Sequence, residues 1–145
     1  MADEKLVVAF TGKGGTGKTV LTALTLKLLL NQGRKNLLVV DADPATNLPD
    51  VLGIKIDKTV GKIATELKKK IGDADTIPPD IDKKSLLESL ILQTLTETPQ
   101  YDLLAMGRTE GEGCYCLVNN LLTDIIDTLS KNYELNLMDM EAGLE

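Results

Sequence analysis

Short runs rich in apolar residues alternate along the chain with longer segments that look helical, and in the last of these the apolar residues recur at helical spacing. Four short runs stand between glycines or polar residues and predict strands: 6–10, 36–40, 101–107 and 134–140. The first two, "LVVAF" and "NLLVV", lack the polar alternation of a half-exposed strand. They indicate a parallel sheet that is covered on both faces.

The segments between these runs look helical. They span residues 18–32, 59–71, 85–95 and 117–129. Gly33 follows the first helix where a C-terminal cap belongs, and Ser85 with Glu88 fits an N-terminal capping box on the third. In the last helix the apolar residues form one stripe: 117, 118, 121, 122, 125, 126 and 129. Residues 72–84 contain two adjacent prolines and predict a loop.

Strands that alternate with helices predict an α/β fold with a mostly parallel sheet. The length of 145 residues is typical of one domain, so we expect a single domain over residues 1–145. The carboxyl ends of its strands are where α/β proteins bind their ligands.

A glycine-rich segment follows the first strand and opens the first helix. Its sequence, "GKGGTGKT" at 12–19, fits the pattern G-x-x-x-x-G-K-[ST] of a P-loop. Glycines let the backbone turn its N–H groups toward a phosphate, Lys18 would reach the β- and γ-phosphates, and Thr19 would ligate Mg²⁺. The alternative is a glycine-rich turn that binds nothing, but the strand–helix context favours phosphate. The predicted ATP/ADP site comprises Gly12, Lys13, Gly14, Gly15, Thr16, Gly17, Lys18 and Thr19.

Carboxylates end two of the predicted strands. Asp41 and Asp43, in "DADP", follow the second strand, and Asp139 closes the fourth. Two carboxylates at this edge can serve Mg²⁺ and orient a water molecule. The alternative for Asp41 and Asp43 is a pair of turn residues that cap the next segment.

Composition and charge narrow the range of partners. The chain has a net charge of −6, which argues against nucleic acid, and its apolar runs are shorter than a membrane span or a signal peptide needs. We therefore expect a cytoplasmic protein with reduced cysteines. The sequence has no histidine, so any metal must be held by thiolates or carboxylates.

The two cysteines of the chain, Cys114 and Cys116, are separated by one residue. Two thiolates suit Ni²⁺ or Zn²⁺ but supply only half of a four-ligand site. A two-fold dimer supplies the same pair twice, so we predict a metal shared by two chains. The alternative is that both are small buried hydrophobic residues.

The "KGGxGKT" form resembles the deviant Walker A box of the family that contains partitioning and division-site ATPases and the nitrogenase iron protein. The resemblance implies a three-layer P-loop NTPase fold and ATP hydrolysis. It also implies that Lys13 crosses a dimer interface to the partner's nucleotide, that Asp43 positions the attacking water and that Asp41 supports Mg²⁺. Asp139 then stands where a Walker B carboxylate belongs, and "EAGLE" at 141–145 looks like a switch that senses the γ-phosphate.

A narrower resemblance joins "VVDADPATNL", "LLAMGRTEGEGCYCLVNNLL" and "DMEAGLE". Together with the P-loop, these segments resemble CooC, a family of nickel-insertion accessory ATPases for carbon monoxide dehydrogenase and related acetyl-CoA synthase systems. The resemblance implies an ATP- and metal-dependent homodimer and a client nickel enzyme. Relatives continue past the fourth strand, so the sequence is expected to hold the N-terminal part of the family domain. Thr16, Thr109 and Glu112 depart from the family pattern, which often has valine at the first position and proline at the other two.

Two rival functions stay open at this point. One is an iron–sulfur redox protein that resembles the nitrogenase iron protein, although that family spaces its two cluster cysteines far apart. The other is a partitioning or division-site positioning ATPase, whose membrane-attached version needs a terminal amphipathic helix that this sequence does not show.

Overall fold

A computed structural model describes residues 5–72, 77–109 and 114–141. The strands in these ranges are β1 (Leu6–Phe10), β2 (Leu37–Ala42), β3 (Thr96–Glu97), β4 (Asp102–Ala105) and β5 (Leu135–Met140). The helices are α1 (Lys18–Asn31), α2 (Leu48–Leu52), α3 (Val60–Ile71), α4 (Lys83–Thr94), α5 (Cys114–Leu129) and the 3₁₀ turn η1 (Ser130–Asn132).

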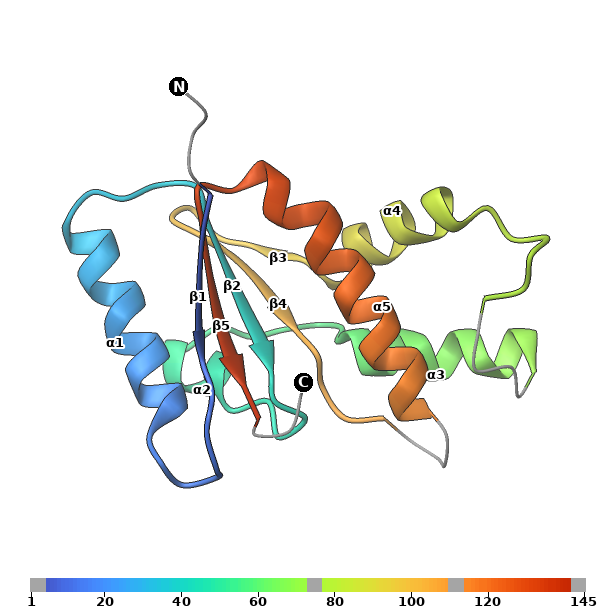
Figure 1. The fold of residues 1–145 in the computed structure, drawn as a ribbon, viewed down its shortest axis with the longest axis horizontal. Helices are drawn as coiled ribbons and strands as arrows, with labels where there is room; N and C mark the ends of the chain where they lie inside the picture. Colours follow the sequence, from blue (N-terminus) through green and yellow to red (C-terminus); the bar gives the residue numbers. More distant parts are fainter. Residues whose placement is uncertain (1–4, 73–76, 110–113, 142–145) are drawn as a thin grey trace.

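The strands form one sheet in the order β1-β5-β2-β4-β3, and all pairs are parallel except the short β3–β4 pair. The last strand in sequence, β5, therefore lies between β1 and β2. This order places Asp139 directly opposite both Asp41 and Phe10. The predicted α/β class with a mostly parallel sheet is confirmed, and its carboxyl edge brings together segments far apart in the sequence (Figure 1).

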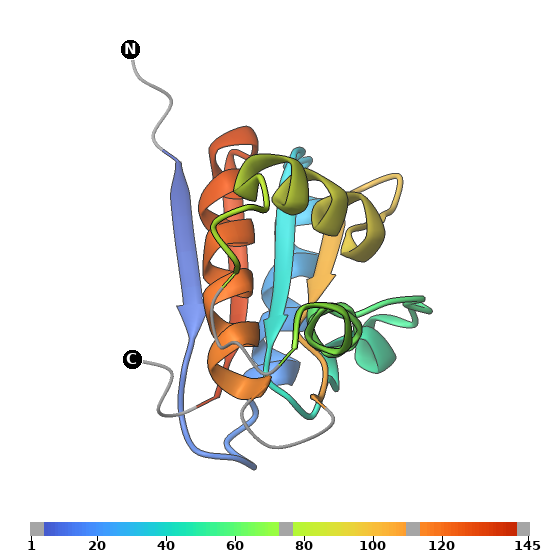
Figure 2. The same cartoon turned by 90° about the vertical axis from the view of Figure 1, so that its right-hand side faces the viewer.

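Helices cover both faces of the sheet, which gives the three layers seen in Figures 1 and 2. Leu37 and Val39 of β2 pack on the side of α1, whereas the alternate residues Leu38 and Val40 pack on the side of α3, α4 and α5. Every residue of β2 is buried, as expected for a central strand of a parallel sheet.

Two helix predictions are confirmed in detail: the apolar stripe of α5 and the glycine that ends α1. In α5 the stripe residues other than Ile126 are all buried, and Ile126 packs against the same core. After α1, Gly33 adopts a φ of 75° and its N–H bonds to the carbonyl of Leu30. Such a left-handed residue ends the helix at low steric cost because glycine has no Cβ.

Other local predictions were wrong. Helix α4 begins at Lys83, and its N-cap is Asp82, whose carboxylate accepts the backbone N–H of Ser85 at 3.1 Å. Ser85 is therefore inside the helix because a carboxylate three residues earlier outcompetes its hydroxyl as the cap. The strand expected over 101–107 is shorter, and the segments that form α2 and β3 were not predicted as elements.

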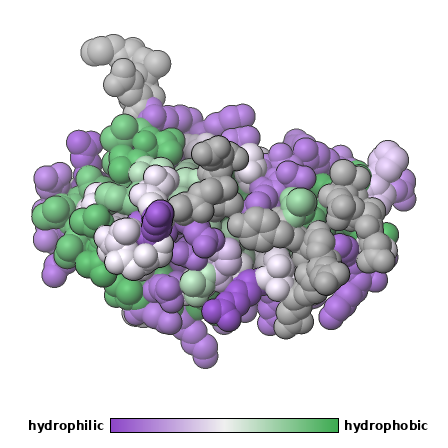
Figure 3. Space-filling model, turned by 60° about the horizontal axis from the view of Figure 1, so that its bottom comes forward, coloured by the Kyte–Doolittle hydropathy of each residue, from purple (hydrophilic) through white to green (hydrophobic). Residues whose placement is uncertain are grey.

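One flank of the described structure exposes apolar surface. Strand β1 pairs on one side only among the described residues, and Leu6 and Val7 are about half exposed. Further exposed apolar residues lie on α1: Val20, Leu21, Leu24 and Leu28. Figure 3 shows this hydrophobic surface on the side of the molecule where α1 lies. An uncovered apolar sheet edge of this kind favours association with another surface. Within the described ranges, no helix is long and apolar enough to span a membrane.

Candidate nucleotide-binding site

The glycine-rich segment makes a tight turn between β1 and α1. Gly15 and Gly17 have φ values of 78° and 85°, and Gly17 is the N-cap of α1. A residue with a Cβ would be strained at either position. The turn leaves the first N–H groups of α1 without a side-chain cap, which is the arrangement that receives a phosphate.

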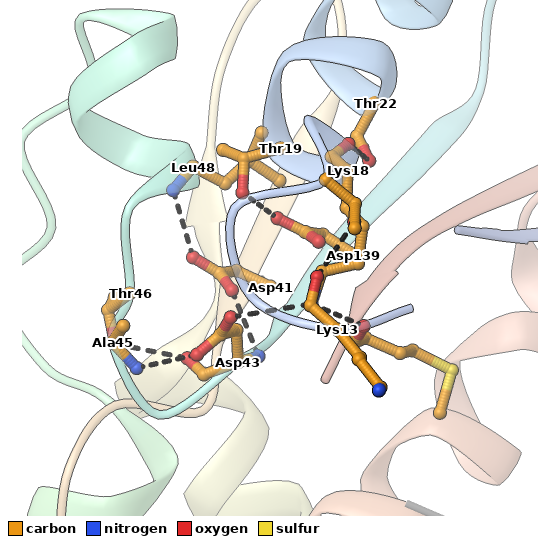
Figure 4. Close-up of polar contacts among 12 residues, drawn as sticks. Lys13, Lys18, Thr19, Thr22, Asp41, Asp43, Ala45, Thr46, Leu48 and Asp139 are labelled. Carbon is orange, nitrogen blue, oxygen red and sulfur yellow. Dashed lines mark hydrogen bonds and ion pairs between the residues drawn. The ribbon is translucent and has the colours of Figure 1, made fainter. Parts of the chain in front are cut away.

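Lys18 is held at the centre of this edge. Its side chain is buried, and its Nζ donates to the carbonyl oxygen of Met140 at 3.0 Å. The same Nζ lies 3.8 Å from Oδ2 of Asp43. Lys18 therefore connects the P-loop to the ends of β2 and β5 (Figure 4).

Thr19 and Asp139 form the arrangement expected for a magnesium site. Oγ1 of Thr19 donates to Oδ2 of Asp139 at 2.6 Å. The other oxygen, Oδ1 of Asp139, is buried and has no hydrogen-bond partner among the described residues. A hydroxyl beside a carboxylate with an unsatisfied buried oxygen fits a hard cation such as Mg²⁺.

Asp41 stabilises the backbone at the same carboxyl edge of the sheet. Its carboxylate is fully buried and accepts the backbone N–H groups of Asp43 and Leu48, each at 3.1 Å. Burial raises the pKa of Asp41 to about 6, the two backbone hydrogen bonds oppose this, and the nearby charges of Asp139 and Asp43 add to it. The bond to Leu48 fixes the start of α2. The predicted support of Mg²⁺ by Asp41 stays a prediction, since both of its oxygens are already engaged within the chain.

The two carboxylate oxygens of Asp43 have different surroundings: one caps a turn and the other faces the P-loop lysine. Its Oδ1 accepts the N–H of Ala45 at 2.8 Å, and its carbonyl accepts the N–H of Thr46 at 3.0 Å. The turn-capping interpretation thus holds for Asp43, while Oδ2 remains directed toward Lys18. Thr46 has a φ of 55°, which is uncommon for a β-branched residue and indicates a constrained turn.

Lys13 lies apart from these carboxylates. Its side chain is exposed, and its backbone carbonyl accepts the hydroxyl of Thr16 at 2.7 Å. The side chain contacts none of the described acidic groups, so its predicted role across a dimer interface stays a prediction.

The cysteine pair opens α5. The helix begins at Cys114, and Cys116 in its first turn is exposed and free, so the interpretation as a buried hydrophobic residue is wrong for Cys116. Among the residues that the structure describes, no group of three or more cysteine, aspartate or glutamate side chains is placed to hold a metal. The "EGEG" segment at 110–113 and the last four residues of "EAGLE" lie outside the described residues.

A connection that the sequence did not reveal links the two regions. The N–H of Met106 donates to the carbonyl of Asp41 at 2.7 Å, and the carbonyl of Met106 accepts the N–H of Gly61 at 2.7 Å. A Cβ on Gly107, whose φ is 70°, would lie 2.2 Å from Oγ1 of Thr59. The segment that leads from β4 to the cysteines is thus packed against both β2 and α3. Two glycines, Gly61 and Gly107, are the only sequence signal for this contact.

The strand–loop–helix geometry, the buried Lys18 and the Thr19–Asp139 pair define a nucleotide-binding P-loop protein. A family model described as "Anion-transporting ATPase" matches residues 5–102, which is more than half of the chain. The chain belongs to this ATPase family.

Relatives in the family are longer than this chain. An ATP-binding protein of Methanocaldococcus jannaschii is 52% identical over 97% of this chain and 54% of its own length. The carbon monoxide dehydrogenase accessory protein CooC of Rhodospirillum rubrum is 30% identical over 95% of this chain and 55% of its own length. The chain thus spans about half the length of the curated relatives it matches.

A solved structure confirms the fold. A ParA family ATPase from Chlorobium tepidum superposes with a TM-score of 0.62 at 20% identity, covering 97% of this chain and 53% of that one. The predicted P-loop NTPase fold is therefore confirmed.

Proposed function

We propose that this chain is the nucleotide-binding part of an ATP-driven metallochaperone, which dimerises and delivers nickel to a client enzyme such as carbon monoxide dehydrogenase. Two lines support the proposal. The similarity to the accessory protein CooC extends over 95% of the chain. The exposed Cys116 stands in the first turn of α5, ten residues after Met106, whose N–H is bonded to the carbonyl of Asp41.

The residues of the nucleotide site have distinct tasks in this proposal. Lys18 leaves the carbonyl of Met140 and the carboxylate of Asp43 to neutralise the β- and γ-phosphates. Thr19 and Asp139 would hold Mg²⁺, and the ion would supply positive charge beside the transferred phosphoryl group. Asp43, once released from Lys18, positions the attacking water at the phosphate, as the resemblance implies.

The single observation that carries the metallochaperone proposal is the hydrogen bond from Met106 to Asp41. Asp41 anchors the loop that holds Asp43, and Met106 begins the segment that leads to Cys114 and Cys116. A shift of the Asp43 loop on ATP binding would therefore move the backbone that leads to the cysteines. The described part of this route runs from Asp41 to Met106 and on to Thr109, and the proposal requires that the shift be passed on from there to the cysteines, as coupling between metal transfer and hydrolysis demands.

The metal is the cargo of the proposed protein. Cys114 and Cys116 supply two thiolates, which Ni²⁺ and Zn²⁺ both accept, and a second copy of the chain supplies the other two. ATP-dependent dimerisation would then assemble the site, and hydrolysis would open it.

Metal titration of cysteine variants tests this function. We expect Cys114→Ser and Cys116→Ser each to lose most Ni²⁺ and Zn²⁺ affinity, because each substitution removes two of four ligands from a symmetric site. Thr123→Ala, at an exposed position of the same helix, is the matched control and should bind like the unmodified chain. Unchanged metal affinity in both serine variants would contradict the proposal. A visible absorption band typical of an iron–sulfur cluster would favour the redox protein instead.

A further inference from the structure

Arg108 lies between the nucleotide site and α3. It lines an open cavity of about 340 Å³ together with Asp43, Pro44, Ala45, Thr109 and Glu141. It also lines a second cavity of about 430 Å³ with Lys62, Thr65, Glu66 and Lys69. The first of these cavities is the relevant one, because Asp43 joins it directly to the P-loop lysine at 3.8 Å.

The backbone of Arg108 is fixed by close packing. A Cβ on Gly61 would lie 2.5 Å from the carbonyl oxygen of Arg108, and the preceding residue, Gly107, packs equally closely on Thr59. Met106 is bonded on both sides, to Asp41 and to Gly61. The base of the side chain is therefore held at a constant position relative to the end of β2.

The guanidinium itself is not engaged by any side chain in the described ranges. Arg108 is exposed, and it has no hydrogen bond or ion pair with any of the described residues. Lys18, in contrast, is already bonded within the chain. A long cation on a rigid base, next to the carboxylate that faces the P-loop, is an arrangement suited to binding an anion that arrives from solution.

We propose that the guanidinium of Arg108 enters the cavity beside Asp43 and binds the terminal phosphate oxygens of a nucleoside triphosphate held by the P-loop of the same chain. This inference rests on the proposed nucleotide function. A planar guanidinium can donate two parallel hydrogen bonds to one phosphate, which Lys18 cannot do. Such a cation stabilises the charge of the transferred group and distinguishes triphosphate from diphosphate.

Calorimetry with two nucleotides tests the proposal. ADP and a non-hydrolysable ATP analogue with an imido bridge are titrated into the unmodified chain, Arg108→Ala, Arg108→Lys and Arg34→Ala. Arg34 is the matched control because it lies at the opposite, amino-terminal end of the strands. We expect Arg108→Ala to bind the analogue about tenfold more weakly with ADP affinity unchanged, the lysine variant to fall between, and Arg34→Ala to match the unmodified chain.

The outcomes separate the two proposals. If Arg108→Ala keeps the same ratio of analogue to ADP affinity as the unmodified chain, Arg108 does not contact the terminal phosphate, while nucleotide binding stands. If the unmodified chain binds neither nucleotide, the proposed function fails and the assignment of Arg108 fails with it. Equal melting temperatures of the Arg108 variants and the unmodified chain show that the substitutions act on the ligand and not on folding.

Discussion

Replacing Lys18 with alanine removes the cation on which the nucleotide site is centred. In the chain without nucleotide, its Nζ donates to the carbonyl of Met140 at 3.0 Å and lies 3.8 Å from Asp43. A bound phosphate would take over these contacts. The substitution therefore removes an interaction with the ligand and an interaction within the free protein, and the effect on affinity is the difference between them.

The size of the effect follows from these two contacts. A hydrogen bond that involves a charged group contributes roughly 1.5–3 kcal/mol, which applies to each ammonium–phosphate bond that is gained and to the one bond to the Met140 carbonyl that is given up. The ion pair at 3.8 Å adds little to this cost, because it is longer than a hydrogen-bonded pair. Several phosphate oxygens contact the ammonium, so we expect a net loss of about 1.4 kcal/mol or more, which is at least a tenfold weaker affinity for ATP.

Isothermal titration with ATP and Mg²⁺ measures this change. Lys27→Ala, at an exposed position of the same helix, removes an equal charge away from the site and should leave the affinity unchanged. Thermal unfolding of both variants shows whether the Met140 carbonyl, left without its donor, destabilises the fold. Equal ATP affinity of Lys18→Ala and the unmodified chain would refute the P-loop assignment.

Three further substitutions test other parts of the site. Asp43→Asn keeps the turn but removes the negative charge, so ATP hydrolysis should fall while ATP-driven dimerisation persists; turnover at the unmodified rate would show that Asp43 does not position water. Burial raises the pKa of Asp41 to about 6, so between pH 4 and 6 the folded chain binds more protons than the unfolded chain. The unfolding free energy of the unmodified chain relative to Asp41→Asn should therefore fall by about 2 kcal/mol as the pH rises from 4 to 7, and a flat difference in urea unfolding would contradict this. Gly107→Ala places a Cβ 2.2 Å from Oγ1 of Thr59 at a φ of 70°, so it should lower the unfolding free energy by about 1–3 kcal/mol, and an unchanged melting temperature would argue against the tight packing of this segment.

The elements that the sequence predicted best are those whose burial pattern is local and repeated. The stripe of α5 was located from spacing alone, because one side of the helix must be buried. The apolar run of β1 located a strand correctly, but the expectation that it is covered on both faces was wrong: β1 is an edge strand whose residues are exposed or half-buried among the described residues. The capping of α4 was misplaced because Asp82 and Ser85 are both good caps, and only the path of the chain decides between them. Helix α2 was missed because a buried carboxylate, Asp41, fixes its first residue from outside the segment.

The candidate site was predictable where its residues are contiguous in the sequence, and not where their contacts depend on the path of the chain. The P-loop residues are contiguous, so their motif placed them together. The pairing of Thr19 with Asp139 was expected only in outline, because it depends on β5 lying between β1 and β2. The bond from Met106 to Asp41 and the position of Arg108 depend on tertiary packing of two glycines, which no short motif encodes.

The central claim is that two chains share one metal through Cys114 and Cys116. Native mass spectrometry of the protein with ATP and Ni²⁺ measures the stoichiometry of the assembly directly. We predict a species with two chains and one Ni²⁺, which loses its metal in either single serine variant. A species with one chain and one Ni²⁺ that keeps the metal in the serine variants would show that the ligands come from within one chain, and it would contradict the shared site.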